Sequence, residues 1–454
     1  MTDRNAQNDA QLAHYVEIFA ERAGNDGSGW LGPVRQEAIE RFAELGFPSR
    51  RLEEWRYTNV APIAKQAFVP ALRSDGDDGV DDGDLAGLDL PDFGGSRLVF
   101  IDGHFADRAS KFLDDPAFEF QSLAQAAKAE APAQGSALAL YGDLVDAKDD
   151  GFSALNTAFA TDGAVVTLKR GQALAGPLQI VFVSSAVSEK QPRASFPRVL
   201  IVAEPGSAGV IVQDHISLGS GPALSCAVCE VTVEGNASLE MILMQRESGA
   251  TFHIARQRIR QQRSSRFSLH TLNLGGAILR NELEIVLADE GAACILNGLY
   301  LASDQQLVDN HTLVDHAMPH CESSELYKGI LADRARGVFR GRVIVRPGAQ
   351  GTAAEQQNRN LLLNRGAEVN TKPQLEIYAD DVKCNHGSSI GQLDEEALFF
   401  LRSRGLDERV ARVLLTKGFA AQITESIRTE SIRDWAAAVV SSRLEALFST
   451  GESQ

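Results

Sequence analysis

A chain of 454 residues in which 61 acidic residues outnumber 44 basic ones carries a formal charge of −17. Such acidity repels phosphate backbones and argues against nucleic acid as a partner. No apolar run approaches the roughly 18 residues that a membrane-spanning helix needs, the start lacks a signal-peptide pattern, and five cysteines are too few for a disulfide framework. We therefore expect a cytoplasmic globular protein without a membrane or nucleic-acid partner.

Residues 1–95 are predicted to form a helical N-terminal region that ends in an acidic linker. Apolar residues at three- and four-residue spacing predict helices from Asp9 to Arg22 and from Val34 to Leu45. The linker is expected between Asp75 and Asp92, where eight aspartates and no basic residue leave little apolar surface to bury. Residues 96–163 follow as a mixed α/β connecting region.

A compact cluster from Arg50 to Thr58 mixes charges of both signs with two large aromatic residues. We interpret it as a docked loop or short helix in which Trp55 and Tyr57 pack inward, because aromatic side chains bury a large apolar area. This interpretation makes the cluster a structural contact rather than a site of chemistry.

Residues 164–390 are predicted to form the core of the protein. Aliphatic and β-branched runs alternate here with turns that pair a charged residue or Pro with a Gly able to adopt positive φ. The interval from Gly235 to Gly291 is close to twice the interval from Gly206 to Gly235, as expected for two periods and one period of a repeat. A repeat made of strands alone is typical of a solenoid of stacked β turns. We therefore predict a mainly β fold with a β-helix core, and a large β-sandwich is the alternative.

Residues 391–454 are predicted to be a helical C-terminal domain. Asp394 and Asp407 are suitable N-caps for two helices, and a third helix is expected from about Glu430 to Phe448. The apolar faces of these helices need a partner, either inside the chain or on another protein.

Two familiar motifs do not point to function. The chain has no G-x-x-x-x-G-K-[ST] loop, so we expect it to bind no nucleotide itself by P-loop chemistry. Cys226 and Cys229 have the spacing of a redox or zinc pair, but residues three apart on a strand face opposite sides. We therefore expect both cysteines to be structural.

One segment contains four potential metal ligands within eleven residues: His311, His316, His320 and Cys321. Histidine and cysteine together are typical zinc ligands. The neighbouring apolar residues instead favour a strand and turn inside the β core, where histidines commonly make buried hydrogen bonds. Metal binding by these four residues is the secondary hypothesis.

Cys384 and His386 are the leading candidates for a metal site. They are two residues apart, so on a strand both side chains leave the same face. A thiolate beside an imidazole suits iron, zinc or an iron–sulfur intermediate. The pair supplies only half of a four-ligand site, so further ligands must come from elsewhere, and another subunit is a plausible source.

Several segments together form a recognisable pattern that extends from about residue 45 to 447. They are Lys383–Gly391, Phe399–Gly405, Tyr327–Gly329 with Gly341–Arg342, Gln356–Asn358 and Arg51–Thr58. This pattern resembles the SufB/SufD family of iron–sulfur cluster assembly proteins, and its SufD branch in particular. The resemblance is weakest in the first forty residues and between 75 and 160.

The resemblance implies a right-handed β-helix through which SufB and SufD pair, and a C-terminal helical domain that docks the SufC ATPase. The chain would be a non-enzymatic subunit, with iron or an iron–sulfur cluster bound transiently at the SufB–SufD interface. His386 matches the SufD histidine placed there opposite a SufB cysteine, and Cys384 matches its neighbour. Where SufB carries its cysteine this chain has Arg359, so it is not expected to be a complete scaffold alone.

Two other functions stay open. A β-helix is also found in carbohydrate-active enzymes, which need acidic pairs along an exposed groove, although such enzymes are commonly secreted and the signal peptide is missing. The chain could instead be a structural module that associates with itself through its β edges. A homodimer of the chain alone, the stoichiometry of the complex and a bound flavin are not decided by the sequence.

Overall fold

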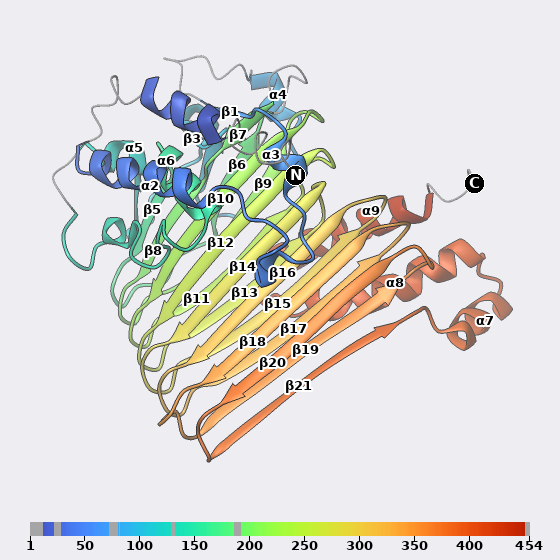
Figure 1. The fold of residues 1–454 in the computed structure, drawn as a ribbon. Coiled ribbons are helices and arrows are strands. Elements are labelled where there is room, and N and C mark those ends of the chain that lie inside the picture. The colour runs from blue at the N-terminus through green and yellow to red at the C-terminus, as the bar shows by residue number, and fades with distance from the viewer. Residues whose placement is uncertain are drawn as a thin grey trace.

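Two long, mainly parallel β-sheets dominate the computed structural model, which describes residues 12–21, 29–71, 80, 82–128, 132–185 and 192–449 (Figure 1). Each turn of the chain adds one strand to each sheet, so the strands of consecutive turns pair in parallel. Leu307, for example, pairs with Arg336, which occupies the same position one turn later. The result is a β-solenoid of about seven turns with helices at both ends of the chain, which confirms the predicted fold class.

The first sheet, sheet A, has a single path of paired strands with a short side branch. The path runs through β4 (Phe118–Ser122), β5 (Ala164–Leu168), β8 (Arg198–Ala203), β10 (Ala223–Val233), β12 (Thr251–Gln261), β14 (Ile278–Leu287), β16 (Leu307–His316), β18 (Arg336–Val345) and β20 (Glu368–Ile377). The branch consists of β7 (Arg193–Ser195), which pairs with β10, and β1 (Val69–Pro70), which pairs with β7. Sheet A thus ends at β20.

The second sheet, sheet B, follows the same succession of turns. Its path runs through β3 (His104–Phe105), β2 (Arg97–Ile101), β6 (Leu178–Ser184), β9 (Ala208–Ser217), β11 (Ser238–Gln245), β13 (Arg266–Asn273), β15 (Ala293–Ala302), β17 (Glu322–Leu331), β19 (Thr352–Leu362) and β21 (Val382–Gly391). Sheet B ends at β21. We call the end of the solenoid formed by β20 and β21 the open end.

Apolar side chains fill the interior between the two sheets. On sheet A one ladder of directly paired, buried residues crosses five turns: Ile201, Val231, Ile259, Ile285 and Val314. Each fully buried aliphatic side chain contributes about 1.5–3 kcal/mol of transfer free energy. Because alternate residues of a strand face opposite sides, this ladder fixes which residues of every strand face the interior.

The turns follow the predicted chemistry at some positions and use other residues at others. Gly206 and Gly291 adopt positive φ, at 71° and 72°. At the intervening turn the residue with positive φ is Asn236, at 59°, and not Gly235. Asn is one of the few residues other than Gly that tolerate this conformation, so the chain keeps the turn geometry with a different residue.

The N-terminal region and the connecting region 96–163 cover the outer faces of the first turns, with α2 (Leu31–Leu45) and α6 (Gly151–Phe159) against sheet A. The other helices of these two regions are η1 (Glu53–Trp55), α3 (Ala61–Ala64), α4 (Asp82–Ala86), η2 (Asp107–Ala109), α5 (Leu123–Ala126) and η3 (Ala137–Leu140), and residues 12–21 are also helical. Phe42 and Phe152 join one buried cluster with Leu224 and Ile254 of the sheet. The helix predicted from Val34 therefore exists, and it packs against the solenoid.

Two expectations for this region need correction. Trp55 is buried, but the side chain of Tyr57 is 48% exposed, so the prediction that both aromatic residues pack inward was wrong for Tyr57. The predicted acidic linker is also ordered in part, because α4 forms within it and Val80 is buried against Val99 and Ile101 of β2. Residues 72–79 and 81, like the predicted helix ends at Asp9 and Arg22, lie outside the described residues.

The C-terminal helices are α7 (Glu395–Ser403), α8 (Glu408–Thr424) and α9 (Glu430–Ser449). The predicted N-caps are confirmed, since Asp394 accepts hydrogen bonds from backbone N–H groups of α7 and Asp407 does so for α8. Buried residues of α8 and α9, such as Ile423 and Ile432, pack on the outer face of sheet B, whereas α7 projects away from the solenoid (Figure 1). No helix within the described ranges has the length and apolarity that a membrane crossing requires.

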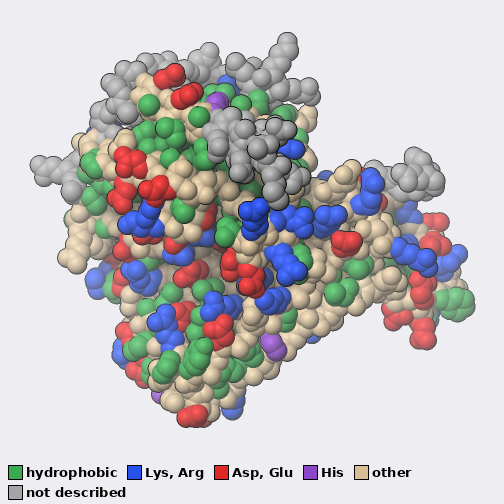
Figure 2. All heavy atoms as spheres, in the orientation of Figure 1, with side chains coloured by type: hydrophobic (Ala, Val, Ile, Leu, Met, Phe, Trp, Pro, Cys, Tyr) green, Lys and Arg blue, Asp and Glu red, His purple; other side chains and the backbone are tan. Residues whose placement is uncertain are grey.

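Acidic and basic side chains are interspersed on the face of the molecule shown in Figure 2. Acidic and basic side chains also pair across neighbouring strands of the solenoid, as Arg342 does with Glu376. The net charge of −17 is therefore not gathered into one patch on this face, and charge alone does not mark a functional site there.

Candidate functional site

Cys384 and His386 lie on β21, at the open end of the solenoid. Cys384 packs against the interior apolar cluster, so its side chain faces the interior. His386 follows two residues later, about 7 Å along the strand, and shares that face. Because β21 is the last strand of sheet B, Cys384 is only half-buried and His386 is exposed. The structure thus places both residues on one accessible face, as the strand spacing predicts.

A column of polar residues lies beneath His386. His386 pairs in register with Gln356 on β19, which in turn pairs with Glu325 on β17. Gln356 and Glu325 are both buried, and the Gln356 Nε2 atom donates a hydrogen bond of 2.6 Å to Glu325 Oε2. The Glu325 carboxyl group inside the solenoid is thereby hydrogen-bonded to Gln356, the residue that pairs in register with His386.

Burial raises the pKa of Glu325 to about 7, from its ordinary value of 4.5, despite the hydrogen bond from Gln356. The folded protein then binds a proton more tightly than the unfolded chain, so its stability falls as the pH rises from about 4.5 through about 7. The Glu325→Gln variant removes this titration, and we expect it to be more stable than the wild type at pH 8 by on the order of 3 kcal/mol.

Urea unfolding of both proteins at pH 5, 6, 7 and 8 measures this difference. The two midpoints should diverge as the pH rises, with the wild type falling below Glu325→Gln. Parallel pH profiles for the two proteins would show that Glu325 does not titrate in this range. Glu355→Gln, a change of an exposed carboxylate on β19, serves as the control, and its profile should match that of the wild type.

Cys384 differs from the other cysteines of the chain. Cys226, Cys229, Cys294 and Cys321 are buried, whereas Cys384 is half-buried. Burial raises the pKa of the Cys384 thiol, which keeps the thiol protonated near neutral pH. In the part of the chain that the structure describes, no third His, Cys, Asp or Glu completes a ligand group with Cys384 and His386.

The expected structural role of Cys226 and Cys229 is confirmed. Cys226 belongs to the cluster between sheet A and the N-terminal helices, and Cys229 belongs to the solenoid interior. The two sulfur atoms therefore lie on opposite faces of β10. Arg359 is exposed, and its Nη2 atom donates to Gln357 Oε1 at 2.6 Å.

The structure does not bring His311, His316, His320 and Cys321 together. His311 and His316 lie on β16 five residues apart and so face opposite sides of the sheet. His316 is buried and lies 2.8 Å from Ser323 Oγ through its Nε2 atom, while His320 occupies a turn with a φ of 58°. The four residues do not form one metal site.

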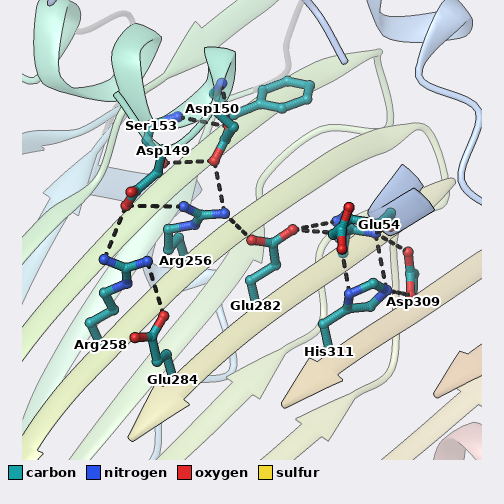
Figure 3. A network of polar contacts seen from close by, with 12 residues as sticks. Glu54, Asp149, Asp150, Ser153, Arg256, Arg258, Glu282, Glu284, Asp309 and His311 are labelled. Carbon is teal, nitrogen blue, oxygen red and sulfur yellow. Dashed lines mark hydrogen bonds and ion pairs between the residues drawn. The ribbon is translucent and has the colours of Figure 1, made fainter. Parts of the chain in front are cut away.

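His311 instead belongs to a network of ion pairs on the outer face of sheet A (Figure 3). Its Nε2 atom lies 3.0 Å from Asp309 Oδ1, and Asp309 also pairs with Arg280. Arg280 continues the network to Glu282, which pairs with Arg256. Burial opposes ionisation of Glu282, but Arg280 and Arg256 hold the pKa of its carboxyl well below the ordinary value, so the network stays charged.

This network anchors the cluster from Arg50 to Thr58. The Arg280 guanidinium lies 3.8 Å from the centre of the Trp55 ring and donates a 3.0 Å hydrogen bond to the Glu54 backbone oxygen. Thr58 Oγ1 donates to Asp309. The cluster is therefore a docking contact between the N-terminal region and the solenoid, in agreement with its structural interpretation.

Sequence reasoning missed Glu325 and Gln356 as neighbours of the candidate site. Glu325, Gln356 and His386 lie on three successive turns of the solenoid, so their proximity depends on the strand register of all three. The segment Gln356–Asn358 was singled out only by family resemblance. No local spacing in the sequence signals that Glu325 belongs to the same column.

Comparisons with known proteins cover both structural regions. A family model described as the SUF system FeS cluster assembly, SufBD core domain matches residues 184–419, and a SufBD protein N-terminal region model matches residues 9–180. An iron–sulfur cluster assembly SufBD family protein of Synechocystis is 35% identical over 411 residues, which are 88% of each chain. The iron–sulfur cluster assembly protein SufD of Escherichia coli is 29% identical, with 91% of this chain and 93% of the relative aligned. SufD of Bacillus subtilis is 26% identical, with 95% and 97% aligned.

Proposed function

The chain belongs to the SufBD family of iron–sulfur cluster assembly proteins, and from this premise we propose that it is a non-enzymatic subunit of a cytoplasmic SufB–SufC–SufD type complex. In this proposal it pairs with SufB, supplies half of the nascent-cluster site and docks the SufC ATPase. The observation that carries the proposal is the position of Cys384 and His386 on the interior face of the last strand, where they are accessible to a partner.

Strand edges at the open end support pairing with a second solenoid. β20 and β21 are the terminal strands of the two sheets, and a terminal strand offers backbone N–H and C=O groups to an added strand. A SufB solenoid that continues both sheets would bring its own ligands over Cys384 and His386. Iron or an iron–sulfur cluster is then the transient cargo of a shared site, completed by the partner.

The experiment that tests the function is reconstitution with SufB and SufC. Cluster yield, measured as iron and acid-labile sulfide per complex, should be high with this chain and low when it is omitted. Equal yield without the chain would contradict the proposal. Light scattering of the same mixtures should show a complex with SufB in preference to a homodimer, and preference for self-association would favour the structural-module hypothesis instead.

The projecting helix α7 supports docking of SufC. Phe399 and Phe400 on α7 have exposed fractions of 73% and 53%, and Val410 and Leu414 on α8 are also exposed. Hydrophobic side chains are visible at the end of the projection formed by the C-terminal helices in Figure 2. Exposed aromatic residues in such a group are typical of a protein–protein interface.

We expect the double variant Phe399→Asp/Phe400→Asp to weaken SufC binding by about 100-fold or more, because interface aromatic residues each contribute about 2 kcal/mol or more. Calorimetric titration of SufC into the purified chain measures the change. Leu52→Asp, which alters a residue 52% exposed in the N-terminal region, is the matched control and should leave the affinity unchanged. Unchanged affinity of the double variant would place the SufC contact elsewhere.

A further inference from the structure

A second group of metal-ligand residues lies inside the solenoid at its early turns. His215 is on β9, His253 is on β12, and Glu247 lies in the loop between β11 and β12. One ligand atom from each residue lies within 4.8 Å of the other two. Within the described part of the chain this is the one group of three or more His, Cys, Asp and Glu residues that meets such a criterion.

All three side chains are removed from solvent. The exposed fractions are 1% for His215, 4% for Glu247 and 0% for His253. The His253 Nδ1 atom lies 2.7 Å from Glu247 Oε2, and the two imidazole rings are 4.8 Å apart between centroids. Two imidazoles and one carboxylate are therefore packed together away from solvent.

Two histidine nitrogen atoms of this group make no hydrogen bond with any described residue and are available to bind a metal ion. Among the described residues, neither His215 Nδ1 nor His253 Nε2 has a hydrogen-bond partner, although both atoms are buried. A buried polar atom without a partner costs about 1–3 kcal/mol, and such atoms are rare in folded proteins.

Neighbouring side chains hold the group in the manner of outer-shell residues in metal sites. The Gln213 Nε2 atom lies 2.8 Å from His215 Nε2, and the Gln213 Oε1 atom is buried without a hydrogen-bond partner in the part of the chain that the structure describes. Since the nitrogen and oxygen of an amide can be exchanged by a half-turn, the turned amide would accept a hydrogen bond from His215 Nε2 and leave Nδ1 open to a metal ion. Gln245 Nε2 donates a 3.0 Å hydrogen bond to Glu247 Oε2. Phe182 stacks on the His215 ring at 5.0 Å between centroids, which fixes the orientation of that ring.

We propose that His215, Glu247 and His253 bind one divalent transition-metal ion of the zinc class in a structural role. Two imidazoles and a carboxylate are a common zinc ligand set. The ion would connect β9, β12 and the loop between β11 and β12, and thereby brace the early turns of the solenoid. The site lies six strands of sheet B from β21, roughly 29 Å away at about 4.8 Å per strand, so it is separate from the nascent-cluster site.

Metal analysis of the purified full chain tests the proposal. Inductively coupled plasma mass spectrometry of protein prepared without chelators should find about one zinc, or one other divalent first-row ion, per chain. His215→Ala and His253→Ala should each reduce this content at least 10-fold. His316→Ala, a change of another buried histidine, is the control that should retain the ion.

Gln213→Ala keeps the three ligands and covers the case in which the ligand variants do not fold. It should weaken binding about 10- to 100-fold, as expected for an outer-shell residue, in a competition titration with a chromogenic zinc chelator. Wild-type protein that contains no metal and shows no rise in melting temperature with added Zn²⁺ would overturn the proposal. Metal content that is unaffected by His215→Ala and His253→Ala would also overturn the proposal. Neither result would test the proposed function in cluster assembly.

Discussion

Replacing His386 by Ala is expected to abolish cluster formation on the complex with SufB and SufC while leaving the fold of the chain intact. His386 is exposed on the last strand of sheet B, and truncation of an exposed side chain usually changes stability by less than about 0.5 kcal/mol. The same truncation removes one of the two ligands that we propose for this chain, and iron bound by nitrogen and sulfur needs its full ligand set. Iron and sulfide content with the visible absorbance of the complex measures the loss.

Asn385→Ala is the matched control for this experiment. Asn385 is exposed and lies between Cys384 and His386 on β21, but its side chain leaves the other face of the strand. Its complex should form clusters at the wild-type level. An equal loss in both variants would indicate damage to the strand rather than removal of a ligand, and full yield from His386→Ala would exclude His386 from the site. The cluster yield of the Cys384→Ser variant then tests the second residue of the pair. A loss of clusters would indicate that Cys384 is a ligand, and wild-type yield would indicate that it is not.

Replacing Arg198 by Met is expected to lower the free energy of unfolding by about 3–5 kcal/mol, since it leaves a buried carboxylate without its cation. Arg198 and Glu230 form an ion pair in which both side chains are fully buried. Arg198 also donates to Asn156 Oδ1 at 3.0 Å, and Glu230 accepts hydrogen bonds from the backbone N–H groups of Leu144 and Val145. The pair thus fastens the connecting region, residues 96–163, to sheet A.

Urea unfolding followed by circular dichroism gives the size of this effect. Arg342→Met, which breaks a partly exposed pair with Glu376, is the control and should cost no more than about 1 kcal/mol. Adding Glu230→Gln to Arg198→Met should recover part of the loss, because the unpaired charge is then removed. A midpoint for Arg198→Met equal to that of Arg342→Met would show that the buried pair does not fasten the two regions.

The solenoid and the common orientation of Cys384 and His386 could be predicted because both depend on residues that are close together in the sequence. Gly206 and Gly291 recur at positions where the backbone needs positive φ, and the strands between such turns alternate in a way that reveals their faces. Cys384 and His386 are two residues apart, and alternate residues of a strand share a face, so both side chains are placed on one face without any knowledge of the tertiary structure. The N-caps Asp394 and Asp407 are likewise local signals.

Residues that lie next to each other inside the solenoid but belong to different turns could not be predicted in this way, because the turns differ in length. Arg266 pairs with Ala293 and Arg336 pairs with Glu368, and the second of these turns is longer than the first. A shift of one residue in register turns a side chain to the other face, so neither the column below His386 nor the group around Glu247 follows from spacing. The position of Tyr57 was also missed, since local aromatic content does not show which ring the solenoid covers.

The open end is, in the proposed complex, the surface that meets SufB. Amide hydrogen exchange of the chain, followed by mass spectrometry with and without SufB, tests this contact most directly. We expect slower exchange over residues 368–377 and 382–391, the strands β20 and β21, because their terminal edges become paired, and unchanged exchange over the N-terminal region. Protection confined to other surfaces, with β20 and β21 exchanging as in the free chain, would contradict the proposed contact.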